Sequence, residues 1–353
     1  MSSKCADRVR AVLRGEVPDR VPIFEYLIHD GVFARLGYPN IAVNDVNTYF
    51  TACSKVLDLC HPTLYAPFEP GERINENGTK TVFERWMTWE LPAPDHLDTE
   101  EIRLKNMKEA IEKLEAGEPM EGRLQSALAE KKKRDQFTGD MVYVDCGAAP
   151  ILPYDNTAKS IYFYMDNTEL VERWIHLENR RTMEYLQAVA YPELSAVGMI
   201  WADIAYKGGM FYPEDVLKRL VYPALAEMCD IFHSRDMPVV YHSDGDCTEA
   251  FPYLADCGID GFNTFELSGA MNHEAFKQEY HGRMAMVGGM DAVNVLAFGT
   301  VDEVVAATKR LIDVVGAGGG LIAASSSGQV DDSMPTDNVM AFYETCWEYG
   351  RYR

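Results

Sequence analysis

Residues 238–266 read PVVYHSDGDCTEAFPYLADCGIDGFNTFE, which is two short β-rich runs on either side of a helical pattern. The first run is Pro238–Asp244 and the second is Gly261–Glu266, and FPYLADCG between them has the apolar spacing of a helix. Consecutive strands that are joined through a helix pair in parallel, because the helix carries the chain back across the sheet. This stretch therefore predicts one repeat of a parallel α/β sheet.

The same alternation of strand and helix patterns extends through the chain. The strand candidates are Val21–Tyr26, Pro62–Phe68, Met141–Cys146, Ala196–Asp203, Pro238–Asp244, Gly261–Glu266, Met284–Met290 and Gly320–Ser327. Helices are expected between them, including one that Pro213 opens and one that a capping box of Thr300 and Glu303 opens. Eight β/α units predict a single (β/α)8 TIM barrel, and a chain of 353 residues needs no second domain to form one. The alternative is an open doubly wound sheet, but no glycine-rich nucleotide-binding fingerprint follows the first strand.

The stretch 69–140, between the second and third strand candidates, is too long for one crossover. It contains a predicted hairpin, KTVFERWMTWEL at 80–91, and charged helical patterns at 100–117 and 130–135. We therefore expect an insertion of about 69–140 that covers one end of the barrel, with its charges on a solvated helix face.

The charge balance excludes several classes of partner. Lys and Arg number 33 against 55 Asp and Glu, a formal net charge of −22. Such a field repels phosphate backbones and anionic lipids, so neither nucleic acid nor a membrane is an expected partner. The N-terminus lacks the apolar core of a signal peptide, and no apolar run approaches the roughly 18 residues of a membrane span. We expect a cytoplasmic protein, and the sequence leaves a homodimer open.

The eight cysteines are scattered along the chain and form no CxxC pair. This pattern is typical of reduced, mostly buried thiols. Metal binding by Cys247 or Cys257 is the alternative, although Cys257 falls within the helical pattern FPYLADCG.

Polar residues stand at the end of most strand candidates, where the catalytic groups of a closed barrel lie. These residues are Glu25, Asp203, His242, Asp244, Glu266, Asp291 and Ser325–Ser327. Several carboxylates around one mouth are costly to bury unless they pair, bind a cation or take up protons.

The motif YHSDGD carries the densest group of these residues. His242 and Asp244 are two positions apart, so on a strand their side chains face the same way, and Glu266 at the next strand end is a third candidate ligand. Three protein ligands and an open position are typical of a catalytic metal site. The structural alternative is that Asp244 and Gly245 form a turn while Asp246 caps a helix.

Asp203 has several candidate roles. It could act as a general base, accept a hydrogen bond from the substrate or orient His242. Its structural alternative is to cap the loop that follows its strand.

Motifs along the chain resemble the uroporphyrinogen decarboxylase-like superfamily. They are RGEVPDRVPIFEY at 14–26, WADIAYKGG at 201–209, YHSDGD, GIDGFNTFE, GGMDA at 288–292, GGGLIAASSSGQVDDSMPTDN at 318–338 and the final YGRY. The resemblance spans nearly the whole chain and is most specific from Trp201 onward. It implies a (β/α)8 barrel and one of two chemistries: decarboxylation of uroporphyrinogen without a cofactor, or zinc-dependent methyl transfer with corrinoid proteins or thiols.

The decarboxylase branch is the poorer match. Its arginine-rich N-terminal motif and its Phe-Ser-Asp motif are both absent, because the first strand runs into YLIHDGVFARLGYPN and the second into YAPFEPGERIN. A mouth rich in carboxylates is also a poor fit to a tetrapyrrole with eight carboxylates. The resemblance is therefore closer to the corrinoid-dependent methyltransferase branch.

That branch, and the similar cobalamin-independent methionine synthases, bind zinc through a His-x-Cys pair on strand five and a cysteine on strand eight; the synthases add a glutamate on strand six. Here His242 matches the histidine, Asp244 stands in place of the first cysteine, Glu266 lies at the glutamate and Ser325–Ser327 occupy the region of the last cysteine. The resemblance thus implies a site for zinc or another divalent metal in which oxygen groups replace both thiolates.

Imidazole and carboxylate ligands leave a harder, more Lewis-acidic ion than thiolates do, and such an ion suits an oxygen substrate. We therefore expect a methyltransferase of an O-demethylation system, which passes a methyl group from a small methoxylated or methylated compound to the corrinoid of a partner protein. Its candidate catalytic residues are Asp203 and Asp244. Its candidate substrate-binding residues are Glu25, Tyr206, Asp291 and Ser327, with aromatic residues expected near the mouth at Tyr26, Trp201, Tyr206 and Tyr241.

Two other functions remain open from the residues alone. The first is a metal-free decarboxylase of a different small acid, in which Asp203 or Asp244 handles the proton. The second is a noncatalytic binding barrel. Chelators would leave a metal-free decarboxylase active. Loss of the His242 or Asp244 side chain would leave the ligand affinity of a binding barrel largely intact.

Overall fold

The structure is a computed structural model that describes residues 4–61, 67–155, 157–267 and 271–352. Its main strands are short and lie in two parallel sheets. The first sheet has the order β1-β3-β7 and consists of β1 (Phe24–Glu25), β3 (Leu59–Cys60) and β7 (Val142–Tyr143). The second has the order β8-β9-β12-β13-β14-β15 and consists of β8 (Gly147–Ala148), β9 (Gly198–Trp201), β12 (Val239–His242), β13 (Gly261–Asn263), β14 (Ala285–Met290) and β15 (Leu321–Ser325).

Short links connect these two sheets. β7 ends at Tyr143 and β8 begins at Gly147 in the same segment. On the other side, an isolated parallel bridge pairs Ile23, next to β1, with Ala323 in β15. A second parallel pair, β2 (Leu27–Ile28) with β16 (Val330–Asp331), follows the same two strands. The fold is therefore α/β with a parallel sheet, as the strand-helix alternation predicts.

All but one of the predicted strand regions contain an observed strand. The exception is Pro62–Phe68, of which residues 62–66 lie outside the described part of the chain, while residues 67 and 68 are not in a strand. The strand in this part of the chain is β3, which ends at Cys60. A two-residue strand has too few alternating positions to produce a period-2 signal, so the sequence pattern does not single out β3.

The longer helices are α1 (Lys4–Leu13), α2 (Asp30–Arg35), α3 (Val46–Cys53), α4 (Glu100–Ala116), α5 (Arg123–Thr138), α6 (Ala158–Asp166), α7 (Thr168–Val189), α9 (Tyr222–His233), α10 (Phe251–Asp256), α11 (His273–Tyr280), α12 (Val301–Leu311) and α13 (Thr336–Tyr349). Shorter helical elements are η1 (Asp95–Leu97), α8 (Glu214–Val216), η2 (Leu217–Val221), η3 (Ala292–Ala297) and η4 (Ile312–Gly316). None of the described helices combines the length and the apolar composition that crossing a membrane requires.

Two helix starts can be compared with the sequence in detail. Thr300 and Glu303 form the predicted capping box at the start of α12. The helix expected after Pro213 is instead divided into α8, the π-helical turn η2 and α9. Pro223 explains the interruption, because proline has no N–H with which to continue the α-helical hydrogen bonds.

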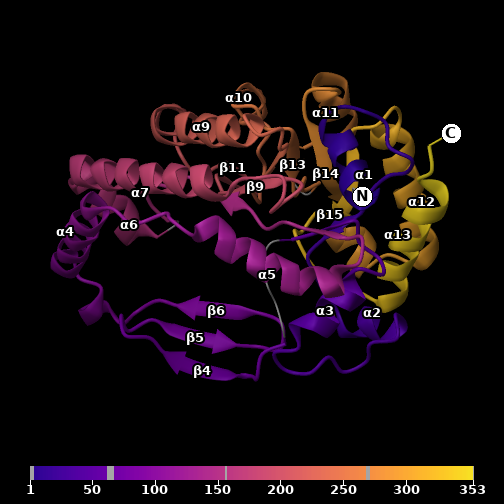
Figure 1. Cartoon of the computed structure of the whole chain (residues 1–353), viewed down its shortest axis with the longest axis horizontal. Helices are drawn as coiled ribbons and strands as arrows, with labels where there is room; N and C mark the ends of the chain where they lie inside the picture. Colours follow the sequence, from indigo (N-terminus) through magenta and orange to yellow (C-terminus); the bar gives the residue numbers. More distant parts are fainter. Residues whose placement is uncertain (1–3, 62–66, 156, 268–270, 353) are drawn as a thin grey trace.

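The segment between β3 and β7 contains a separate antiparallel sheet and two long helices. The sheet consists of β4 (Gly71–Ile74), β5 (Lys80–Phe83) and β6 (Thr88–Leu91), and β5 and β6 form the hairpin predicted at 80–91. In Figure 1 this sheet lies at the lower edge, below α5. α4 contacts α7 and α5 contacts α3, so the helices are attached to the rest of the molecule.

Both faces of the parallel strands are buried, and alternate residues divide between two apolar clusters. Val240 packs with α1 in the smaller cluster, whereas its neighbours Val239 and Tyr241 belong to the larger one. Successive side chains of a strand point to opposite faces, so this division is what a sheet covered on both sides requires. The smaller cluster contains Val9, Phe24, Leu59, Val142, Met199, Val240, Val287 and Ile322.

Charged residues close the end of the molecule where the strands begin. Asp58, which directly precedes β3, is fully buried. Its carboxylate accepts from Arg8 Nη1 at 2.5 Å, from Arg20 Nη1 and Nη2 at 2.8 Å each, and from the Ile23 N–H at 2.9 Å. The Asp58 carboxylate is therefore paired with the guanidinium groups of both Arg8 and Arg20.

We predict that Asp58→Ala destabilises the protein strongly. The substitution leaves the Arg8 guanidinium buried without this partner, and removing one member of a buried ion pair costs about 3–5 kcal/mol. The free energy of unfolding, measured in urea by circular dichroism, should fall by this amount. A matched control is Asp256→Ala, which breaks an exposed contact with Arg283 and should cost less than about 1 kcal/mol. Equal effects of the two substitutions would contradict the prediction.

Candidate metal centre

Three polar side chains meet where neighbouring strands of the second sheet end. Asp203 follows β9, His242 is the last residue of β12 and Asp244 follows two positions later. β12 pairs with β9 in parallel, with His242 opposite Trp201, so the two strands end at the same level. The parallel register therefore brings these side chains together.

The group has the composition and spacing of a metal site. One ligand atom from each of Asp203, His242 and Asp244 lies within 4.8 Å of the others. His242 Nε2 is 4.0 Å from Asp203 Oδ1 and 3.8 Å from Asp244 Oδ1. Asp203 Oδ1 also accepts a hydrogen bond from the Asp244 N–H at 3.0 Å, which fixes the carboxylate beside the turn.

Asp244 carries an oxygen that lacks a partner. Its Oδ1 is shielded from solvent and makes no hydrogen bond of normal geometry with any described residue. Burial raises the pKa of Asp244 and the carboxylates of Asp203 and Glu266 raise it further, whereas His242 and the nearby Thr264 hydroxyl lower it. A buried carboxylate oxygen without a donor is costly, so this position favours a cation or a proton.

A glycine leaves room beside the group. Gly328 lies in the loop after β15 with φ +73°, and a Cβ atom on it would stand 3.3 Å from His242 Cε1 and 3.9 Å from Asp244 Oδ1. Because glycine has no side chain, this space stays open next to both candidate ligands.

His61 is a further histidine at the site. It follows β3, and its ring centroid is 6.2 Å from that of His242 in an edge-to-face arrangement. Burial lowers the pKa of His61 to about 3, and the neighbouring His242 lowers it as well. His61 is therefore neutral at physiological pH.

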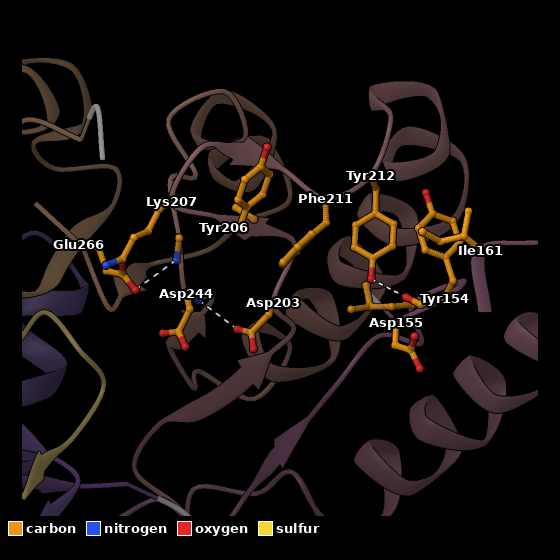
Figure 2. Close-up of a pocket in the computed structure, with 13 residues that line it drawn as sticks. Tyr154, Asp155, Ile161, Asp203, Tyr206, Lys207, Phe211, Tyr212, Asp244 and Glu266 are labelled. Carbon is orange, nitrogen blue, oxygen red and sulfur yellow. Dashed lines mark hydrogen bonds between the residues drawn. The ribbon is translucent and has the colours of Figure 1, made fainter. Parts of the chain in front are cut away.

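A cavity of about 900 Å³ adjoins the group and has Asp203 and Asp244 in its wall. In Figure 2, Glu266 and Lys207 lie on the Asp244 side of the pocket, while aromatic side chains extend in the other direction from Asp203. The aromatic and aliphatic part of the wall consists of Leu152, Tyr154, Ile161, Ala205, Tyr206, Phe211 and Tyr212. Three carboxylates, those of Asp203, Asp244 and Glu266, thus lie at one end of a mostly apolar pocket, and Asp155 lies beside the aromatic residues at the other end (Figure 2).

Glu266 differs from its predicted place. It lines the pocket but does not belong to the three-residue group, in which Asp203 stands instead. Its Oε1 accepts a hydrogen bond from the Gly245 N–H at 3.4 Å. The β13 strand ends at Asn263, so the chain leaves the strand before Glu266 and does not carry its side chain to His242.

Of the predicted substrate-binding residues, Tyr206 lines the pocket and the other three do not. Glu25 is fully buried, where its carboxylate accepts from the Ser325 N–H and Oγ at 2.9 Å each. Asp291 caps η3 by accepting from the N–H groups of the first turn. Ser327 Oγ donates to the Gln329 carbonyl. Asp291 and Ser327 are thus engaged within their own loops, and Glu25 is held by Ser325 of β15.

The predicted mouth aromatics also divide between pocket and core. Tyr206 is half exposed and lines the pocket, whereas Tyr241 is fully buried and donates to the Ala202 carbonyl at 2.7 Å. Tyr26 is buried, and Trp201 is partly exposed outside the pocket wall.

The cysteines agree with the expectation of buried thiols. All eight are free, and six of them are buried. Cys247 Sγ contacts Ser243 Oγ, and among the residues that the structure describes no cysteine joins the metal-ligand group.

Sequence reasoning missed His61, Phe211 and Tyr212. His61 follows directly after the apolar pair of β3, a strand too short to stand out in the sequence pattern. Phe211 and Tyr212 follow the short hairpin of β10 (Ala205–Tyr206) and β11 (Gly209–Met210), which folds them over the pocket. The glycines at 208 and 209 were the available signal for that hairpin.

Comparison with known proteins is consistent with this geometry. A family model described as uroporphyrinogen decarboxylase (URO-D) matches residues 151–349, which include all three residues of the group. The chain belongs to the uroporphyrinogen decarboxylase family. The match covers the strands β9, β12, β13, β14 and β15.

Two methyltransferases are similar to this URO-D family member, one in sequence and one in fold. The chain is 23% identical over 215 residues to a methylated-thiol–coenzyme M methyltransferase of Methanosarcina mazei, an alignment that covers 57% of this chain and 54% of that protein. The alignment therefore spans about half of the curated relative. A solved structure of a methyltransferase from Methanosarcina mazei superimposes with a TM-score of 0.66 at 18% identity, over 98% of each chain, and shows the similarity of the fold.

The residues present fit the divalent metal that the superfamily resemblance implies. They offer one imidazole nitrogen and two carboxylates, an oxygen of Asp244 that lacks a donor, and open space at Gly328. Metal–ligand bonds of about 2.0–2.2 Å in a tetrahedral site place the ligand atoms about 3.3–3.6 Å apart. The observed separations need only small side-chain adjustments to reach this geometry.

The Glu25 carboxyl gives a prediction for the pH dependence of stability. Burial raises its pKa to about 7, although hydrogen bonds from Ser325 and Tyr26 oppose the shift. Between pH 4.5, the usual pKa of this carboxyl, and about pH 7, the folded protein keeps a proton that the unfolded chain has lost. Stability is therefore lost as pH rises through this window, by a few kcal/mol in total.

We predict that Glu25→Gln removes this contribution, because glutamine does not ionise. Urea unfolding of both proteins between about pH 5 and about pH 8 should show the wild type losing stability relative to the variant as pH rises. A difference in unfolding free energy that stays constant with pH would contradict it.

Proposed function

We propose that this protein is a methyltransferase that moves a methyl group from a small methoxylated or methylated compound to the corrinoid of a partner protein. The observation that carries the proposal is the group of Asp203, His242 and Asp244 in the wall of a mostly apolar pocket. The similarity to a methylated-thiol–coenzyme M methyltransferase supports the same reaction type. The substrate and the corrinoid partner are parts of the proposal.

In this proposal, His242, Asp244 and Asp203 hold zinc or another divalent ion, and Asp203 takes the place predicted for Glu266. A bound ion of this kind would supply a Lewis acid that stabilises negative charge on an oxygen leaving group. All three residues come from one chain, so the site does not depend on a homodimer.

The aromatic part of the pocket wall and the carboxylates at its end orient the methyl donor. The apolar part of the compound lies against Tyr206 and Phe211, whose ring centroids are 5.2 Å apart. Its oxygen then faces the carboxylate end at Asp203 and Asp244. The methyl group stays accessible to the partner protein at the opening of the pocket.

Methyl transfer breaks the bond between the methyl carbon and oxygen, and the oxygen keeps the bonding electrons. Glu266 and Lys207 lie on the Asp244 side of the pocket, where they can exchange a proton with the released oxygen (Figure 2). Asp203, with its half-exposed side chain, is the other group available for this proton.

We further propose that the two parallel sheets form one closed (β/α)8 barrel, a single domain over residues 1–353 with an insertion at about 69–140. The bridge between Ile23 and Ala323 supports closure, because it joins the first strand to the last. The candidate centre then lies at the strand ends where barrel enzymes carry their catalytic groups.

A metal-free decarboxylase of a small acid is the second candidate. The raised pKa of Asp244 favours it, because a carboxyl that holds its proton can protonate a carbanion. This enzyme would remain active in the presence of chelators, whereas the proposed methyltransferase would not.

We predict that the protein purified without a histidine tag or chelator binds about one equivalent of zinc, measured by elemental mass spectrometry. His242→Ala and Asp203→Ala should each lose most of this metal, because each removes a candidate ligand. Glu266→Ala should lose less, since Glu266 lies outside the group. Asp291→Ala is the control for a carboxylate at another strand end and should retain the metal. A wild-type protein that stays metal-free when zinc is supplied would overturn the metal proposal.

We predict that Phe211→Ala weakens substrate binding with little change in the chemical step. With a reduced corrinoid protein and methoxylated aromatic compounds as donors, KM should rise by about tenfold, as expected for loss of uniform binding. Tyr253→Ala, which alters an aromatic pair away from the pocket, should leave KM unchanged. A fall in kcat without a rise in KM would contradict the assigned role of Phe211.

A further inference from the structure

We propose that Asn263 is a positioning residue that holds His242 in the tautomer with its proton on Nδ1, so that the Nε2 electron pair faces Asp203 and Asp244. The inference rests on the proposed metal role of His242, but its geometry can be tested in metal-free protein. It assigns a function to a buried polar residue of β13 that touches neither the pocket nor the other candidate ligands.

The parallel register places the two side chains next to each other. His242 on β12 is paired with Asn263 on β13, and paired residues on adjacent strands direct their side chains to the same face. His242 Nδ1 and Asn263 Oδ1 are 2.7 Å apart, a short hydrogen-bond distance. Asn263 itself is fully buried, and its backbone carbonyl accepts from the Ser243 N–H at 2.8 Å.

The next strand determines which way the Asn263 amide points. Asn263 Nδ2 is 2.9 Å from the carbonyl oxygen of Val287 on β14. A carbonyl oxygen only accepts hydrogen bonds, so the amide must present its NH2 group to Val287. Rotating the amide by half a turn would bring two acceptor oxygens together in a buried site, which is unfavourable.

The amide orientation then determines the histidine tautomer. With its NH2 group on Val287, Asn263 has only its Oδ1 acceptor to offer to His242. Nδ1 must therefore carry a proton to make the 2.7 Å contact, and in the neutral ring Nε2 is left with its electron pair. A chain of two hydrogen bonds across β12, β13 and β14 thus sets the protonation of the ring.

The position of Nε2 agrees with this tautomer. Its distances of 4.0 Å to Asp203 and 3.8 Å to Asp244 are too long for hydrogen bonds, so neither carboxylate accepts a proton from it. The ring carbon next to Nε2, Cε1, borders the space that Gly328 leaves open beside Asp244. Partners that fix a ligand ring in this manner typically change metal affinity by 10–100-fold.

Two substitutions of Asn263 separate the acceptor from the shape of the side chain. Asn263→Leu has a similar volume but no acceptor, so it should release the tautomer. Asn263→Asp keeps an acceptor for the Nδ1 proton and is the matched rescue variant. Urea unfolding of each variant reports whether it is folded before its site is compared with wild type.

The first measurement is nitrogen NMR of the metal-free protein with labelled histidine rings, at a pH where His242 is neutral. His242→Ala identifies the signals of this ring. We expect wild type to show a protonated Nδ1 and an unprotonated Nε2, and the Leu variant to shift toward protonated Nε2. A wild-type ring protonated on Nε2 would overturn the inference, whether or not the Asn263 variants fold.

The second measurement is the zinc dissociation constant, from competition with a chelator. Asn263→Leu should bind zinc about 10–100-fold more weakly than wild type, whereas Asn263→Asp should stay within a few-fold of it. A folded Leu variant with the wild-type tautomer and affinity would overturn the role of Asn263. Wild-type protein that shows the predicted tautomer but binds no zinc would support the positioning role and overturn only the proposed metal function.

Discussion

The register of β12 between β9 and β13 is the constraint on which the candidate site depends. His242 lies opposite Trp201 on one side and Asn263 on the other, so the three strands end at nearly the same level. A slip by one residue would turn His242 to the opposite face, away from Asn263 and the carboxylates. The buried residues that precede His242 on β12 alternate between two apolar clusters, so burial on both faces specifies this register.

The sequence predicted the parts of the fold that depend on repeated local patterns. Runs such as Met284–Met290 and the Thr300 capping box have enough residues to carry a signal, whereas the two residues of β3 do not. At the site, the spacing of His242 and Asp244 predicted their proximity. The choice of Asp203 over Glu266 was not predictable, because it depends on how the loops leave β9 and β13, for which one sequence offers no periodic signal.

The carboxylates near His242 impose an electrostatic requirement that local hydrogen bonds only partly meet. Asp203 accepts from the Asp244 N–H, but Asp244 Oδ1 has no comparable donor among the described residues, and its pKa is raised by burial and by its acidic neighbours. A proton or a divalent cation would each relieve this cost. The electron pair inferred on Nε2 of the neutral His242 ring favours the cation, because a divalent ion would bind this nitrogen together with the carboxylates.

The direction of the parallel strands separates the stabilising charges from the reactive ones. β3 shows this within four residues, since Asp58 precedes it and His61 follows it. Asp58 is fully paired with Arg8 and Arg20, whereas His61 lies against His242 beside the candidate centre. Parallel strands all begin at one edge of a sheet and all end at the other, so each edge collects groups of one kind. Ion pairs can therefore close the edge where the strands begin without blocking the edge where they end. At that second edge, a reaction needs unpaired oxygens and open space.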